Sequence, residues 1–172
     1  MKRCKRYSLM VLVTLILSGT MPLVINAQES VTVLTGAELM RIVPSGFYFQ
    51  GLSAPTQMRN SAAARFGTRH YVVAGMVDTS GYAADIRARY EGFLITDSVI
   101  TINGSELGVG AYGFGFSSDG KLNVLDLAGK EILSVATTRD NQLKRPRPLM
   151  ITKAQNEVRL YSGKDYAIIG AK

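Results

Sequence analysis

Apolar and polar residues alternate over much of the second half of this chain, a pattern typical of strands that bury one face. The clearest case is the set Tyr112, Phe114 and Phe116, whose members are separated by single glycines. Turn residues interrupt the pattern at Asn103-Gly104, Ser118-Asp119-Gly120 and Ala128-Gly129-Lys130. Glycine, asparagine and aspartate suit reversals because they tolerate positive φ or form local side-chain hydrogen bonds. Residues 92–138 are therefore predicted to form a meander of four or five short strands.

The segments around this meander predict further strands. Aromatic and β-branched residues favour strands at 47–49, 70–77, 149–152, 158–161 and 166–169. Residues 55–78 are predicted to form a hairpin, although good helix formers leave a helix over 56–66 as the alternative. Alternation of apolar and charged residues over 86–91 predicts one more strand.

A single short helix is predicted near the N-terminus. Thr35 and Glu38 have the spacing of a capping box, and apolar residues follow as far as Val43 before Pro44 ends the segment. Regularly spaced short strands with turns between them indicate an antiparallel β-fold. The sequence thus predicts an all-β protein, an antiparallel meander forming a small sandwich or barrel, with one short N-terminal helix.

Residues 1–27 have the layout of a secretory signal peptide. Basic residues come first, an apolar run extends from Leu9 to Leu17, and a cleavage region ends at Ala27. An uncleaved membrane anchor is the alternative, although Pro22 and small polar residues interrupt the apolar stretch. We expect a secreted or periplasmic protein in which residues 28–172 form a single all-β domain.

Removal of the leader changes the charge of the chain. The leader carries four of the 20 basic residues and none of the 13 acidic ones, so residues 28–172 have 16 basic and 13 acidic residues and a net charge of +3. Proteins that bind nucleic acids usually concentrate more basic charge than this on one face. We expect a small ligand or an envelope component as the partner, and no nucleic acid.

Few residues are available for catalysis. The one cysteine, Cys4, lies in the leader, and His70 is the only histidine, so thiolate chemistry and the usual zinc sites are excluded. We expect no metal and no cofactor. The remaining candidates are the carboxylates of Asp78, Asp97, Asp119 and Asp126. Two of them could flank a bond in a small secreted hydrolase, but three are at turn positions, where capping explains them, and Asp126 is predicted inside a strand.

Two groups of residues are candidates for binding. The aromatic face of Tyr112, Phe114 and Phe116 predicts either core packing or the wall of an apolar ligand pocket. The proline-spaced cluster of Lys144, Arg145 and Arg147 is suited to anions or an anionic surface. We interpret the chain as an exported, non-enzymatic β-domain that binds a small apolar or amphipathic ligand, or as an envelope-associated binding module. The alternatives are a small carboxylate-based hydrolase and an interaction subunit that uses loop 144–147.

Overall fold

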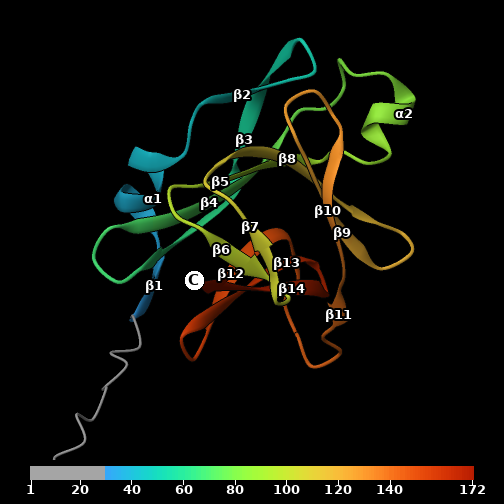
Figure 1. Cartoon of the computed structure of the whole chain (residues 1–172). Helices are drawn as coiled ribbons and strands as arrows, with labels where there is room; N and C mark the ends of the chain where they lie inside the picture. Colours follow the sequence, from blue (N-terminus) through green and yellow to red (C-terminus); the bar gives the residue numbers. More distant parts are fainter. Residues whose placement is uncertain (1–29) are drawn as a thin grey trace, which may run out of the picture.

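A computed structural model describes residues 30–172 and contains two antiparallel β-sheets (Figure 1). The larger sheet has the strand order β1 (Val31–Leu34), β3 (Leu52–Phe66), β4 (His70–Val77), β5 (Gly92–Thr96), β8 (Gly110–Ser117), β9 (Lys121–Leu125) and β10 (Glu131–Ala136), and β2 (Gly46–Phe49) pairs with β3. The smaller sheet has the order β12 (Arg147–Ala154), β13 (Glu157–Gly163), β14 (Asp165–Ala171), β6 (Ile100–Ile102) and β7 (Ser105–Leu107), and β11 (Thr138–Arg139) pairs with β14. The predicted all-β class is confirmed.

The sheets stack around a shared apolar core and are not closed into one barrel. In Figure 1 the red and yellow strands of the smaller sheet lie below the green and brown strands of the larger one. Residues such as Phe66, Leu94 and Phe114 contribute from the larger sheet, and Leu160 and Ile169 contribute from the smaller. Each of these side chains is fully buried, so the space between the sheets is a packed core.

A second apolar core covers the outer face of the larger sheet. The ring of Phe49 stacks on that of Tyr90, with centroids 3.9 Å apart, above Gly113 of β8. A Cβ atom at Gly113 would lie 2.6 Å from the Phe49 ring, and one at Gly115 would lie 2.4 Å from the carbonyl oxygen of Arg89. The glycines that alternate with aromatic residues in β8 therefore allow close approach of Phe49 and of the Arg89 backbone.

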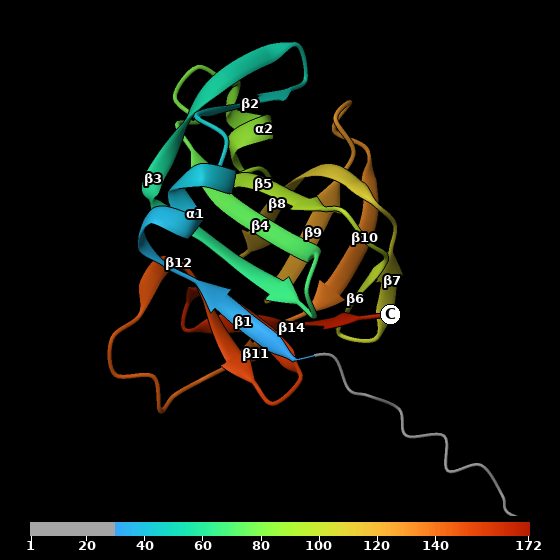
Figure 2. The ribbon, with the colours of Figure 1, turned by 90° about the vertical axis from the view of Figure 1, so that its left-hand side faces the viewer.

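The helix α1 (Gly36–Ile42) lies within the range predicted from the sequence, and Figure 2 shows it beside β3. Thr35 has the extended conformation of an N-cap residue, with φ −141° and ψ 163°, but its side chain makes no capping hydrogen bond. The predicted capping box is therefore present in spacing and backbone geometry but not in its side-chain contact.

The strand predicted over residues 86–91 is wrong, because the helix α2 (Ala84–Arg87) occupies the start of this segment. The backbone N–H of Tyr90 donates to the carbonyl of Ile86 at 2.9 Å, so the segment continues as a helical turn. Ile86 and Tyr90 are four residues apart, and both contribute to the outer core. This packing favours helical geometry over the apparent alternation, which is too short to specify a strand.

The hairpin prediction for residues 55–78 is confirmed, and the helical alternative for 56–66 is wrong. Ala62, Ala63 and Ala64 lie in β3, which pairs with β4 on one edge and with β1 on the other. All three alanines are buried, because both faces of β3 are covered here. Strand pairing and burial on both faces outweigh the helix propensity of alanine.

The predicted meander is correct in its turns, but it has six strands, β5 to β10, instead of four or five, and they do not belong to one sheet. After β5 the chain crosses to the smaller sheet, forms the β6–β7 hairpin and returns to the larger sheet as β8. Asn103 and Gly104 form the hairpin turn with φ 47° and 83°, as their residue types predict. The second half of the predicted meander, β8 to β10, is continuous.

The predicted leader, residues 1–27, lies outside the described residues. Between Ser30 and Lys172, no helix is long and apolar enough to cross a membrane.

Candidate functional site

A half-open pocket of about 230 Å³ lies where the edges of the two sheets approach each other. Its walls come from β1 and α1, from β3, and from the first half of β12. The lining residues are mostly apolar, with one cation, Arg147, and two hydroxyl groups, those of Thr35 and Ser61. The apolar side chains of the lining include Leu34, Leu39, Leu149 and Ile151. We refer to this cavity as the β3–β12 pocket.

The pocket exists because β12 lies close to β3 without pairing with it. β12 is an edge strand of the smaller sheet, and within residues 30–172 it forms a ladder with β13 alone. β1 pairs with β3 between Ala63 and Phe66, and β2 pairs with it between Leu52 and Pro55, so among the described residues no strand pairs with this edge of β3 between the two ladders. The small side chain of Ala62, buried in the main core, allows β12 to come near. The cavity occupies the place where the two sheets would otherwise join.

Arg147 is held at the pocket by the loop that precedes it. Asp140 fixes the start of this loop: its carboxylate accepts a hydrogen bond from the hydroxyl of Tyr161 at 3.0 Å, and its backbone N–H donates to the carbonyl of Lys164 at 2.8 Å. Arg147 begins β12 opposite Gly163, and Pro146 and Pro148 flank it. Two prolines and the Asp140 anchor restrict this loop, which Figure 2 shows between β11 and β12.

The same end of the smaller sheet collects basic side chains. Register pairs Arg147 with Gly163, so Lys164 in the next turn lies beside the loop that carries Lys144 and Arg145. We call Arg139, Lys144, Arg145, Arg147 and Lys164 the basic end. Within residues 30–172, Arg139 forms an ion pair with Asp165 at 3.1 Å, and the other four form none.

The net positive charge of residues 28–172 is concentrated in the last quarter of this range. Residues 138–172 hold eight basic and three acidic residues, a net charge of +5, and residues 28–137 hold eight basic and ten acidic residues, a net charge of −2. The modest total of +3 hides this division. The basic part forms four strands of the smaller sheet, β11 to β14, and includes the basic end.

The predicted aromatic face lies away from the pocket. Phe114 is fully buried between the sheets, and Tyr112 and Phe116 are half-buried and pack against the same core. The hydroxyl of Tyr112 donates to the carbonyl of Gly108 at 3.0 Å. The structure favours the core-packing alternative for this face, and binding of a ligand by its residues stays a prediction.

The candidate carboxylates have structural partners. Asp78 accepts a hydrogen bond from the backbone N–H of Ser80, and Asp97 accepts one from that of Tyr71. The prediction that Asp126 lies inside a strand is wrong: β9 ends at Leu125, and Asp126 accepts hydrogen bonds from the N–H groups of Ala128 and Lys130 in a turn. Gly129 has φ 83°, a backbone conformation that glycine adopts readily, and this allows the chain to reverse here.

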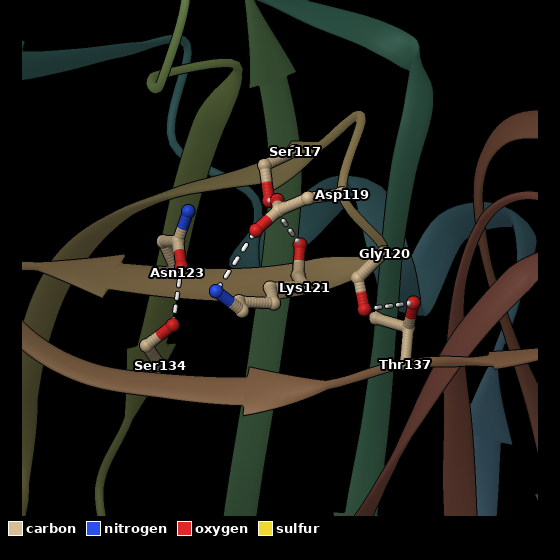
Figure 3. A network of polar contacts seen from close by, with 7 residues as sticks. All are labelled: Ser117, Asp119, Gly120, Lys121, Asn123, Ser134 and Thr137. Atoms are coloured by element: carbon tan, nitrogen blue, oxygen red, sulfur yellow. Dashed lines mark hydrogen bonds and ion pairs between the residues drawn. The ribbon is translucent and has the colours of Figure 1, made fainter.

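Asp119 belongs to an exposed polar network, shown in Figure 3. Its carboxylate accepts a hydrogen bond from the hydroxyl of Ser117 and pairs with the ammonium group of Lys121 at 2.8 Å. These two contacts hold the pKa of Asp119 below its usual value. Nearby, the hydroxyl of Ser134 donates to the side-chain oxygen of Asn123 at 2.7 Å, joining β10 to β9. The network stabilises the β8–β9 turn and the β9–β10 pair.

His70 lies at the start of β4, exposed, with its Nδ1 atom 3.8 Å from a carboxylate oxygen of Asp97. It is not among the residues that line the β3–β12 pocket. Over residues 30–172 no group of three or more histidine, cysteine or acidic side chains is arranged to hold a metal ion.

Sequence reasoning missed the apolar part of the pocket and two members of the basic end, Arg139 and Lys164. Leu34 and Ile151 are separated by more than a hundred positions, and nothing in either local pattern indicates that they share a cavity. Lys164 lies between the strands predicted at 158–161 and 166–169, but its position beside Arg147 depends on the register of β12 with β13.

Comparisons of this chain with models of protein families, with curated proteins and with solved structures give no match.

Proposed function

We propose that this protein binds a small amphipathic anion in the β3–β12 pocket. The observation that carries the proposal is that Arg147 lines the same cavity as Leu34, Leu39, Leu149 and Ile151. Among residues 30–172 no carboxylate forms an ion pair with this arginine. A guanidinium group beside apolar side chains, in a wall that also exposes polar atoms, complements a ligand with a carboxylate or phosphate head and a short hydrocarbon chain.

The volume of the cavity limits the size of the ligand. Pockets for drug-sized molecules measure roughly 300–1,000 Å³, and this one measures about 230 Å³. It therefore suits a single short chain, with the head group left at the open side. Burial of such a chain contributes about 0.8 kcal/mol for each methylene group removed from water.

The chemistry of the lining favours binding over catalysis. Among the described residues that form the pocket there is no aspartate, glutamate, histidine or cysteine, and the polar side chains are those of Arg147, Thr35 and Ser61. General acid–base catalysis needs a group that exchanges a proton near neutral pH, and an arginine does not do so. We therefore propose a non-enzymatic binding protein.

Titration calorimetry of residues 28–172 with octanoate tests this proposal. We expect Arg147→Gln to weaken binding about 10- to 100-fold, because a hydrogen bond to a charged group contributes roughly 1.5–3 kcal/mol. Lys144→Gln is the matched control, since it removes a neighbouring charge that does not line the cavity, and it should leave the affinity within about threefold. Equal affinities of the two variants for octanoate would contradict the assignment of Arg147.

We also propose that the protein acts outside the cytoplasm, on the basis of the leader predicted at residues 1–27. The N-terminal sequence of the protein isolated from its cells should begin near Gln28. Recovery of intact Met1 in a soluble cytoplasmic fraction would contradict export.

A further inference from the structure

We infer that the basic end of the smaller sheet docks on an anionic lipid bilayer. This inference goes beyond ligand binding in the pocket, because it concerns the exposed surface formed by the β11–β12 loop and the β13–β14 turn. Three observations carry it: uncompensated positive charge, apolar residues beside the cations, and a loop that is already ordered.

The charge of the basic end is available for a partner. Lys144, Arg145 and Arg147 are exposed, and Lys164 is half-buried. The two acidic residues of this region are already engaged, Asp165 with Arg139 and Asp140 with the hydroxyl of Tyr161. Four cations without an ion pair in residues 30–172 therefore share one end of the sheet, which complements the negative surface potential of an anionic bilayer.

The residues between the cations favour a lipid surface over a soluble polyanion. Pro146 and Pro148 are exposed, Leu143 is half-buried, and all three lie next to basic residues along the loop. A polyanion such as a nucleic acid needs only the positive charge and gains little from these side chains. At a bilayer, by contrast, the apolar side chains enter the boundary between head groups and acyl chains while the cations contact the head groups.

The loop needs little ordering to make this contact. Besides its link to Tyr161, the Asp140 carboxylate accepts a hydrogen bond from the backbone N–H of Gln142 at 2.9 Å, which shapes the first turn of the loop. Pro146 and Pro148 fix two further backbone φ angles. Pre-ordering lowers the entropy cost of association. Docking at this end also brings Arg147, which the β3–β12 pocket shares, to the bilayer surface.

Co-sedimentation of residues 28–172 with lipid vesicles tests the inference. We expect binding to vesicles of equal parts phosphatidylglycerol and phosphatidylcholine, and little binding to pure phosphatidylcholine. Each cation near an anionic surface contributes about a fivefold factor in affinity. The triple variant Lys144→Gln, Arg145→Gln, Lys164→Gln should therefore bind roughly 100-fold more weakly. It retains Arg147, so octanoate affinity should be unchanged, and a failure of docking is distinguishable from a failure of the pocket.

The matched control neutralises three exposed arginines elsewhere, Arg59→Gln, Arg87→Gln and Arg89→Gln, with the same change in net charge. It should retain vesicle binding within a fewfold. Equal losses of vesicle affinity in the two triple variants would show that binding depends on net charge alone, and this would overturn the inference.

A separate variant tests the choice of partner. Leu143→Ser should weaken vesicle binding severalfold without a change in charge, because it removes an apolar contact with the bilayer. Unchanged vesicle affinity in this variant, together with full competition by soluble polyphosphate, would identify a polyanion site and overturn the assignment to lipid.

Discussion

Phe114 shows how one side chain of β8 supports the stacking of the two sheets. Its ring is 0% exposed and meets the ring of Phe116 edge to face, with centroids 6.1 Å apart. Replacement by alanine removes this ring and leaves a cavity that a closely packed core fills only in part. We predict that Phe114→Ala lowers the free energy of unfolding by about 3–5 kcal/mol, measured by denaturant unfolding.

Val109→Ala is the control for this measurement, because Val109 is 60% exposed and its truncation should change stability by less than about 0.5 kcal/mol. If Phe114→Ala lowers the free energy of unfolding by less than about 1 kcal/mol, the ring lies outside the core and the ligand-pocket alternative is favoured for this face.

Glu91 is a half-buried carboxylate just before β5. It accepts a hydrogen bond from the backbone N–H of Phe116 at 3.2 Å, and so extends the contact with β8 beyond the end of the β5 ladder. Burial raises the pKa of Glu91 above its usual value, and the hydrogen bond from Phe116 offsets this only in part. The ionised form of Glu91 is therefore disfavoured in the folded protein.

This pKa shift predicts a pH dependence of stability. The folded state holds the proton of Glu91 more tightly than the unfolded state does. The contribution of protonated Glu91 to the free energy of unfolding is therefore complete below the unfolded-state pKa, and it is lost as pH rises through the folded-state pKa. The free energy of unfolding of Glu91→Gln, relative to that of the natural protein, should therefore increase as pH rises from about 4 to about 7. Denaturant unfolding at both pH values measures this difference, with the exposed Glu131→Gln as control. A difference that does not change with pH would contradict the assigned shift.

At this scale the sequence predicts the role of a residue where local geometry decides it. The period of two in β8 predicts the shared face of Phe114 and Phe116, and the turn residue types predict the roles of Asp78 and Asp119. The sequence does not predict the burial of Glu91, because this burial depends on where the ladder between β5 and β8 ends.

The β6–β7 hairpin is the element that joins the two halves of the fold. Asn103, in its turn, has φ 47°; its side-chain oxygen accepts a hydrogen bond from the backbone N–H of Ile168 at 2.7 Å. Its side-chain amide donates to the carbonyl of Ala136 at the end of β10. One turn residue thus contacts both β14 and β10, and so links the smaller sheet to the larger.

We predict that Asn103→Ala destabilises the protein by roughly 1–3 kcal/mol, because it loses two side-chain hydrogen bonds and strains a positive-φ position. Asn141→Ala, in an exposed turn, is the control. Thermal unfolding of the two variants measures the effect, and equal melting temperatures would show that the hairpin turn does not carry this link.

Elements with strong local signals are predictable from this sequence, and their partners are not. The β3–β4 hairpin follows from β-propensity on both sides of Gly67, and α1 from the spacing of Thr35 and Glu38. The α2 helix was missed because the contact of Ile86 and Tyr90 with the outer core selects it. The transfer of β6 and β7 to the second sheet depends on pairing with β14, seventy residues further along the chain.

For the whole molecule, the central feature is the division between the two sheets. The apolar core holds the sheets together, the β3–β12 pocket occupies the gap between their edges, and the positive charge lies on the smaller sheet. The sequence predicts the fold class and the basic loop. It does not predict the pocket, because the segments that form its four walls are far apart in the sequence. The proposed function requires that this cavity binds a ligand.

The most direct test is a two-dimensional NMR titration of residues 28–172 with octanoate. Our account predicts saturable shifts of amide signals that map to the walls of the β3–β12 pocket, namely Leu34, Leu39, Ala62, Leu149 and Ile151. Shifts confined to residues 112–116, or no saturable shifts in the pocket walls, would contradict it.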